Sequence, residues 1–213
     1  MPNSTDLLPE PAQTDDLFVS LANTLGYQRG VLVDGLLNPT ALLDWLHAND
    51  LVSDRGRATE VQRLERDPAE AERRLERFRY LRDLVIAVAD RTSEGHGPTR
   101  EQVRDINHVL RHGLHYHRLV SERGGARYSV AQVGDRLDQA RATIASSLAH
   151  FLAEDDASRL RVCDNDTCRE VFIDRSPTGR RRWCDMRICG NQAKVARHRA
   201  RAREAMAAAV AEG

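Results

Sequence analysis

The sequence has a single lysine, few aromatic residues and no long apolar segment. Lys194 is the only lysine among 32 basic residues, and aromatic residues make up 5% of the 213 positions. The longest uninterrupted apolar runs, residues 84–89 and 205–211, fall far short of the roughly 20 residues that a membrane-spanning helix requires. We therefore expect no membrane-spanning segment and no membrane partner.

Sequence motifs of common enzymes are also missing. No P-loop, dinucleotide-binding glycine motif, nucleophile elbow or pair of catalytic carboxylates is present, so we expect no enzyme and no catalytic residues. Residues 1–14 contain three prolines but no basic stretch followed by an apolar one, so we expect a disordered tail rather than a secretory signal. The expected location is the cytoplasm, where thiols stay reduced.

The net charge of +0 conceals an asymmetry between the two parts of the chain. Residues 1–158 carry 19 basic and 25 acidic side chains, a net charge of −6, whereas residues 159–213 carry 13 basic and 7 acidic ones, a net charge of +6. The basic part also holds all four cysteines. Charge and cysteine content together indicate a separate C-terminal module.

Residues 15–157 have the pattern of a helical domain. Asn38 and Asp67 are each followed by proline, which is a typical start of a helix, and Gly113 is a typical end. Apolar residues recur at helical spacing in five segments. We expect helices over about 16–25, 39–49, 68–91, 98–112 and 136–154.

One β-hairpin is expected within this domain. Residues 115–120 and 127–133 have strand-like composition and flank the glycine turn Arg123-Gly-Gly-Ala126.

The cysteines form two C-x4-C pairs, Cys163 with Cys168 and Cys184 with Cys189, separated by fifteen residues. Four thiolates at this spacing suit one tetrahedral Zn²⁺ in a closed structural site that leaves no position for a reactive water. The segment has too few apolar residues to fold on a core of its own, so metal binding would supply its folding free energy. We expect one structural zinc ion. Iron is the alternative metal, and two disulfides or four free thiols are the alternatives without one.

Short strands and a helix are expected around the cysteines. Residues 159–162 and 171–173 read as strands, and residues 176–179 read as a turn. Gly190 and Asn191 open a helix that continues to near Ala211. The predicted fold class is mainly α: a helical N-terminal domain with one β-hairpin, then a small treble-clef-like zinc finger over residues 158–205, with residues 206–213 as the end of its C-terminal helix.

The C-terminal helix carries a basic face. Lys194, Arg197, His198 and Arg201 fall within about a third of its circumference, because successive residues rotate by about 100°. Phosphate groups of DNA would bind such a face. The alternatives are a solvated basic helix or a face that pairs with the acidic N-terminal half. The expected nucleic-acid-binding residues are Arg180, Arg181, Arg182, Gln192, Lys194, Arg197 and Arg201.

The C-terminal helix also carries apolar residues on one side. A narrow apolar stripe of Val195, Ala202, Met206 and Ala209 lies beside the basic face and is expected to dock on another surface.

Four histidines, His108, His112, His115 and His117, are close in sequence, and neutral imidazoles one helical turn apart can bind zinc or copper. Gly113 interrupts that helix, so we expect a solvated or interface patch rather than a second metal site.

The finger resembles the CGNR zinc finger. The resemblance is carried by the cysteine spacing, by Arg181-Arg182-Trp183-Cys184 and by Cys189-Gly190-Asn191-Gln192, supported by Phe172, Asp174, Ser176, Met186 and Lys194. Gln192 stands where the family has arginine, so it keeps hydrogen-bonding capacity without the charge.

The N-terminal part resembles the helical ABATE domain, which precedes this finger in bacterial proteins described as stress-induced transcription regulators. The resembling residues are Phe18, Leu21-Ala22-Asn23-Thr24 and Leu43-Asp44-Trp45-Leu46.

We expect a zinc-dependent, DNA-binding transcription regulator that forms a homodimer through its helical domain, because one basic module contacts few phosphates. The alternatives are a protein-interaction role of the finger, a helical domain that binds a small-molecule ligand and controls the finger, and a redox switch of the thiolates.

Overall fold

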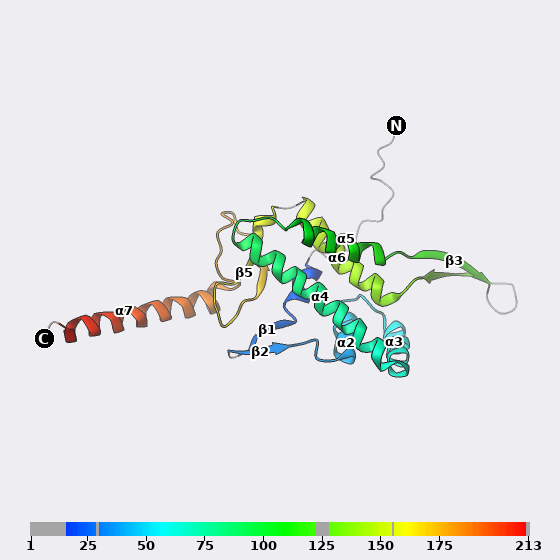
Figure 1. Ribbon diagram of the computed structural model, residues 1–213, viewed down its shortest axis with the longest axis horizontal. Helices are drawn as coiled ribbons and strands as arrows, with labels where there is room; N and C mark the ends of the chain where they lie inside the picture. The colour runs from blue at the N-terminus through cyan, green and yellow to red at the C-terminus, as the bar shows by residue number, and fades with distance from the viewer. Residues whose placement is uncertain (1–15, 29, 122–127, 155, 212–213) are drawn as a thin grey trace, which may run out of the picture.

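The computed structural model describes residues 16–28, 30–121, 128–154 and 156–211, with three antiparallel hairpins among its helices (Figure 1). The tail predicted over residues 1–14 and the predicted turn at residues 123–126 lie outside the described residues. The first half contains α1 (Leu17–Ala22), β1 (Leu25–Gln28), β2 (Val31–Asp34), α2 (Pro39–Ala48), α3 (Asp54–Arg66) and α4 (Pro68–Ser93).

The second half begins with α5 (Arg100–His112), the hairpin of β3 (Tyr116–Ser121) and β4 (Tyr128–Val133), and α6 (Arg136–Glu154). A 3-10 turn (Ala157–Arg159) leads into the short hairpin of β5 (Leu160–Val162) and β6 (Val171–Ile173). A π-helical turn (Met186–Gly190) continues directly into α7 (Asn191–Ala211).

Local capping signals explain where the helices start. The Asn38 side chain accepts a hydrogen bond from the Ala41 amide at 2.9 Å, and Asp67 accepts one from the Glu70 amide at 2.9 Å. Thr99 and Gln102 form a reciprocal capping box at the start of α5. Three of the predicted starts, at Asn38, Asp67 and Asp135, are confirmed.

The prediction was wrong at two places in the first half. The helix expected to continue to about Leu25 ends at Ala22, because Leu25 pairs with Asp34 in the β1–β2 hairpin. Helix α3 was not predicted, since it buries only Gly56, Glu60 and Leu64 and so has almost no apolar periodicity.

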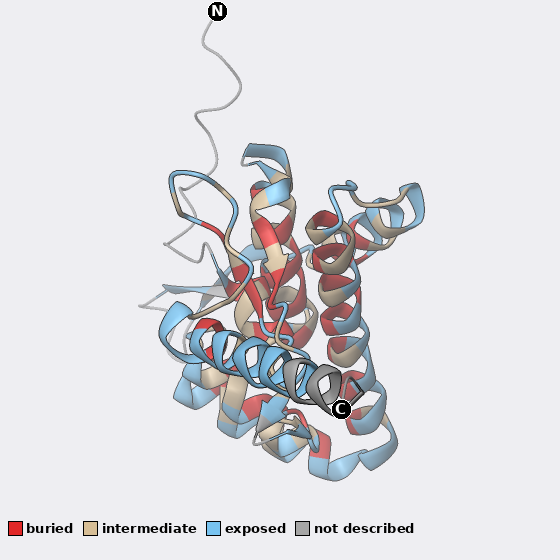
Figure 2. Ribbon diagram, turned by 90° about the vertical axis from the view of Figure 1, so that its left-hand side faces the viewer, coloured by how far each residue is buried: buried red, intermediate tan, exposed pale blue. Residues whose placement is uncertain are grey.

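The core surrounds α4, and the predicted mainly helical fold with a C-terminal finger and helix is confirmed. Buried side chains of α1, α2, α4, α5 and α6 join in one cluster, which also contains Leu160, Val162 and Val171 of the β5–β6 hairpin. Helix α7 projects from one end of the molecule and the β3–β4 hairpin from the other (Figure 1). Figure 2 shows the buried centre in red and α7 in pale blue. Within the described ranges, no helix is both long and apolar enough to span a membrane.

Candidate metal centre and nucleic-acid interface

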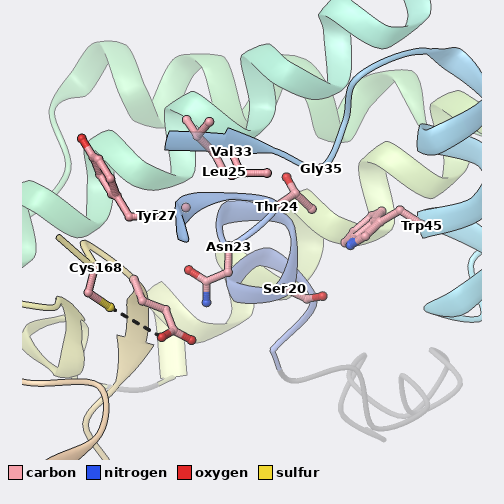
Figure 3. Close-up of a pocket in the computed structure, with 11 residues that line it drawn as sticks. Ser20, Asn23, Thr24, Leu25, Tyr27, Val33, Gly35, Trp45 and Cys168 are labelled. Atoms are coloured by element: carbon pink, nitrogen blue, oxygen red, sulfur yellow. Dashed lines mark hydrogen bonds between the residues drawn. The ribbon is translucent and has the colours of Figure 1, made fainter. Parts of the chain in front are cut away.

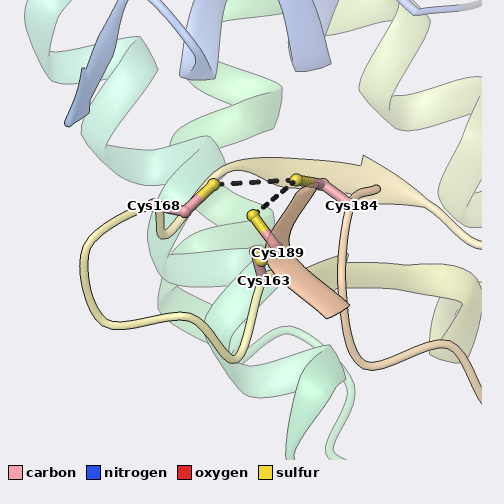
Figure 4. Close-up of side chains that lie close together, drawn as sticks. All are labelled: Cys163, Cys168, Cys184 and Cys189. Atoms are coloured by element: carbon pink, nitrogen blue, oxygen red, sulfur yellow. Dashed lines mark hydrogen bonds between the residues drawn. The ribbon is translucent and has the colours of Figure 1, made fainter. Parts of the chain in front are cut away.

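The four cysteine sulfurs converge on one point, as Figure 4 shows. All four Sγ atoms lie within 4.8 Å of one another, with 3.6 Å between those of Cys168 and Cys184 and 3.8 Å between those of Cys184 and Cys189. A tetrahedron with Zn–S bonds of about 2.3 Å has edges of about 3.8 Å. The cysteines are free thiols, and their separations fit ligands of one ion rather than disulfides.

The environment of these sulfurs calls for a cation. Burial raises the pKa of the Cys168 thiol to about 12 and also raises the pKa of Cys184, whereas at Cys189 burial is outweighed by hydrogen bonds that lower the pKa. Four thiolates this close would repel one another strongly without a positive charge between them. A divalent ion reverses the balance by binding the thiolate form. The donor set therefore fits zinc, with all four positions of a tetrahedral site filled by protein.

Backbone turns fix the ligands on both sides of the site. Cys163 follows β5 directly, and its amide donates to the Glu170 carbonyl at 2.9 Å, which closes the first knuckle. The Asn165 carbonyl accepts from the Cys168 amide at 2.8 Å. In the second knuckle, the Asp185 side chain caps the π-helical turn that carries Cys189. Cys163 and Cys189 are buried together with Phe172 in a small cluster, and Trp183 packs against this cluster.

A fully buried carboxylate organises the loop between the knuckles. Asp174 accepts hydrogen bonds from the Ser176 amide at 3.0 Å and from the Arg181 amide at 2.8 Å. Burial opposes its ionisation, but these hydrogen bonds and the Arg181 charge hold the pKa of Asp174 below its ordinary value. Gly179 closes the turn at φ +62°, where other residues are strained, and packs against the Arg159 guanidinium. The loop is thus bound by Arg159, the residue that directly precedes β5.

Three of the residues predicted to bind nucleic acid have internal contacts. The Arg181 guanidinium lies 5.2 Å from the Phe172 ring centroid and donates to the Trp183 carbonyl at 3.3 Å. Arg182 forms an ion pair with Asp164 and lies over the Trp183 ring. The Gln192 side chain accepts a hydrogen bond from Asn165 at 2.8 Å, which links α7 to the first knuckle. These contacts give each residue a structural role in the finger.

The other predicted residues are exposed. Arg180 and the α7 cations Lys194, Arg197 and Arg201 form no ion pair within the described part of the chain. Arg199 and Arg203, which are not among the predicted binding residues, are equally exposed on α7. Every described side chain from Lys194 to Glu204 is exposed, Val195 by 49%. The apolar stripe therefore packs on no described part of this chain, and the side chains of Met206 and Ala209 lie outside the described ones.

The histidines do not form a second ion-binding cluster. The rings of His108 and His112 lie 4.5 Å apart, and those of His115 and His117 lie 5.8 Å apart. Across the described residues, the cysteines are the one group of three or more histidine, cysteine or acidic side chains placed closely enough to share an ion.

The finger is attached to the helical body by side-chain to main-chain hydrogen bonds. The side chain of Asn23 donates through its Nδ2 atom to the Val171 carbonyl and accepts through its Oδ1 atom from the Val171 main-chain amide, both at 2.9 Å. On β5, the Thr92 hydroxyl donates to the Leu160 carbonyl at 2.6 Å, and the Ser93 hydroxyl accepts from the Val162 amide at 2.7 Å. Sequence reasoning noted Asn23 only as part of a family motif, because its partner is 148 residues away.

A cleft of about 560 Å³ lies between the β1–β2 hairpin, the end of α1 and the finger. Figure 3 shows Trp45 and Ser20 toward one end and Cys168 toward the other. The Cys168 sulfur lies 3.9 Å from a carboxylate oxygen of Glu170, which also lines the cleft. A candidate metal ligand thus forms part of a wall to which both regions of the chain contribute.

Comparison with family models divides the chain between the helical body and the finger. Residues 15–155 match the ABATE model, described as "Putative stress-induced transcription regulator", and residues 159–202 match the CGNR zinc finger model. No curated protein matches the chain.

Proposed function

The chain belongs to the ABATE family and carries a CGNR zinc finger, and from this premise we propose that it is a DNA-binding transcription regulator whose finger is built on a structural zinc ion. Cys163, Cys168, Cys184 and Cys189 would hold the ion. Zinc bound by four thiolates supplies folding free energy rather than a reactive water. Its role here would be to hold the start of α7 against the first knuckle.

One observation carries the DNA-binding proposal: the arginines of the finger fall into two groups. Arg181 and Arg182 of the loop between the knuckles are used in internal contacts, whereas Arg180 of the same loop is exposed. The arginines of α7, such as Arg197 and Arg201, are exposed and free of described carboxylate partners. A projecting helix with unpaired guanidinium groups suits the phosphates of a duplex, because each neutralised phosphate releases counterions.

The test is fluorescence anisotropy of a labelled random duplex with the zinc-loaded full chain across a salt series. The double variant Arg197→Ala/Arg201→Ala should bind about tenfold more weakly at low salt and lower the slope of log affinity against log salt by up to about 2. Its melting temperature should stay unchanged, since neither side chain has a described partner. The matched control is Arg55→Ala/Arg66→Ala, which removes the same charge from exposed positions on α3. Equal binding by both double variants would exclude α7 as the contact surface.

A protein-interaction role is the second candidate, supported by apolar side chains at the base of α7. Met186, Ile188 and Val195 are 46%, 60% and 49% exposed. A complex that survives high salt and is lost with Ile188→Ser would favour this role, since apolar contacts resist screening by ions.

A further inference from the structure

A second cleft, of about 620 Å³, lies where three helices of the body meet. Arg77 and Tyr80 of α4, His108 and His112 of α5 and Arg141 of α6 are among its lining residues. Its volume is within the usual range of about 300–1,000 Å³ for small-molecule sites. None of these residues belongs to the cysteine cluster or to α7, so any role of this cleft is separate from those two features.

Arg141 is a buried cation with incomplete hydrogen bonding. Its side chain is only 9% exposed, and its single ion pair joins Nη2 to Asp138 at 3.2 Å. Its Nε is buried without any partner, and no described group accepts from Nη1. Burial holds the pKa of Arg141 below its ordinary value, and the charges of Arg77 and Arg74 add to this while Asp138 opposes it. A buried guanidinium with unused donors is costly unless an acceptor reaches it.

The carboxylate that faces Arg141 is shared with other cations. Asp138 lies 3.8 Å from Arg74 and 3.9 Å from Arg77, in addition to its contact with Arg141. Arg74 has further partners in Glu70 and Asp135, but Arg77 has no other described carboxylate within 4.0 Å. Arg77 and Arg141 therefore depend on one carboxylate, which leaves positive charge unbalanced on this wall of the cleft.

The acidic side chains of the cleft are already used. Asp105 accepts a hydrogen bond from the Tyr80 hydroxyl at 2.6 Å, an interaction that raises the pKa of Tyr80. Glu76 pairs with Arg79 at 2.6 Å. On α5, the His112 Nδ1 lies 2.7 Å from the His108 carbonyl and donates to it, so the Nε2 atom is left for another partner. Asp105 keeps its negative charge, because a hydroxyl donor does not neutralise it, so the unused hydrogen-bond donors of the cleft lie on the side of Arg141 and Arg77.

We propose that this cleft binds a small organic anion, with its carboxylate or phosphate on Arg141 and Arg77. The planar guanidinium matches both kinds of oxyanion through paired hydrogen bonds. The cleft is larger than an oxyanion alone needs, and the rings of Tyr80 and His108 with the buried Val109 side chain offer contacts for an apolar body. The ligand class is therefore an aromatic or aliphatic acid, or a monophosphate ester.

The experiment uses the zinc-loaded full chain carrying Arg197→Ala/Arg201→Ala, so that anions do not report on α7. Benzoate and inorganic phosphate are titrated at constant ionic strength against chloride, with the ring signals of His108 and Tyr80 followed by NMR. We expect saturable shifts of these signals. The dissociation constant should be at least about tenfold larger in Arg141→Met. Arg77→Met, whose side chain is 45% exposed and whose loss the fold tolerates more easily, should also weaken binding. The control Arg118→Met changes an exposed arginine of β3 and should bind like the parent.

The outcomes separate the proposal from its competitors. Saturation by only one of the two anions supports the site and identifies the headgroup. Equal shifts with benzyl alcohol, the neutral analogue of benzoate, would show that the cleft recognises an apolar body and would overturn the anion proposal. Absence of saturable shifts with both anions would overturn it as well, whatever the outcome of the DNA-binding test.

Discussion

The two parts of the finger differ in how they contact the rest of the chain. The β5–β6 hairpin contributes Leu160, Val162 and Val171 to the core of the helical body, and its main chain is bound by Asn23, which follows α1, and by side chains of α4. Helix α7 is attached through the π-helical turn of the second knuckle and through the hydrogen bond between Gln192 and Asn165 of the first knuckle, and its described side chains from Lys194 onward are exposed. The hairpin is therefore part of the body, whereas α7 is available to a partner.

This difference determines what a bound metal ion would do. In a finger connected by a free linker, metal binding would fold the finger alone. Here Cys163 follows Val162, a core residue, and Glu170 of the first knuckle precedes Val171, another core residue. Metal binding would thus be coupled to core packing through two strands of three residues each.

The largest expected effect is that of metal removal on the helical body. Chelation should lower the melting temperature of the whole chain by at least about 10 °C, because loss of the knuckles releases the core residues of β5 and β6. The measurement is thermal unfolding of Trp183→Phe, which leaves Trp45 of α2 as the single tryptophan reporter. Added zinc should restore the transition. A Trp45 transition insensitive to chelation would show that the hairpin and body are energetically separate.

The next largest effect is the loss of stability when the ion pairs of Asp135, which belong to the helical body and not to the metal site, are removed. Asp135 caps α6 through the Leu137 and Asp138 amides and pairs with Arg63 at 2.8 Å and with the buried Arg74. Asp135→Asn keeps the cap but removes the ion pairs, at a cost of about 3 kcal/mol at pH 7. The matched control is Asp67→Asn, since Asp67 caps α4 without a described ion pair and should cost under about 0.5 kcal/mol.

The pH dependence of this cost follows from the direction of the pKa shift. Burial opposes ionisation of Asp135, but Arg74, the Asp138 amide and Arg63 hold its pKa well below the ordinary 3.8. Its contribution is therefore complete above about pH 5 and is lost progressively as the pH falls from the ordinary pKa to the lower folded-state pKa. The difference in the free energy of unfolding between wild type and Asp135→Asn, measured in urea, should be the same at pH 7 and at pH 5.5. The zinc contribution should fall over that interval, because thiolate ligands compete with protons. A difference that shrinks already at pH 5.5 would contradict the lowered pKa.

The contrast between the two regions also explains what could be predicted from the sequence. The starts of α2, α4 and α6 depend on an Asn or Asp side chain and an amide two or three residues later, so local sequence is enough. The cysteine spacing likewise indicates one shared ion. Helix α3 was missed because its buried Glu60 is stabilised by Arg63 and by Arg136, which is far away in sequence.

Site residues that depend on tertiary contacts could not be assigned in advance. The Arg181-Arg182 pair reads as a basic patch, yet one guanidinium lies over Phe172 and the other pairs with Asp164. Spacing alone does not distinguish these arginines from Arg197, because the distinction is made by neighbours that the two cysteine knuckles bring together.

The smallest expected effect tests a single link between the finger and the body. Asn23→Ala removes both hydrogen bonds to the Val171 main chain and leaves a buried amide and carbonyl without partners. The expected cost is about 2 kcal/mol, measured by urea unfolding. Asn107→Ala, at an exposed position of α5, is the matched control and should be neutral.

A second measurement shows whether that loss reaches the metal. Val171 follows directly on the first knuckle, so a loosened β6 should let Cys168 leave the ion more often, and zinc transfer to a chromogenic chelator should be faster in Asn23→Ala than in Asn107→Ala. A destabilised variant with an unchanged transfer rate would mean that Asn23 stabilises the body without holding the finger. Faster transfer would place α1, through one asparagine, in control of how firmly the finger keeps its metal.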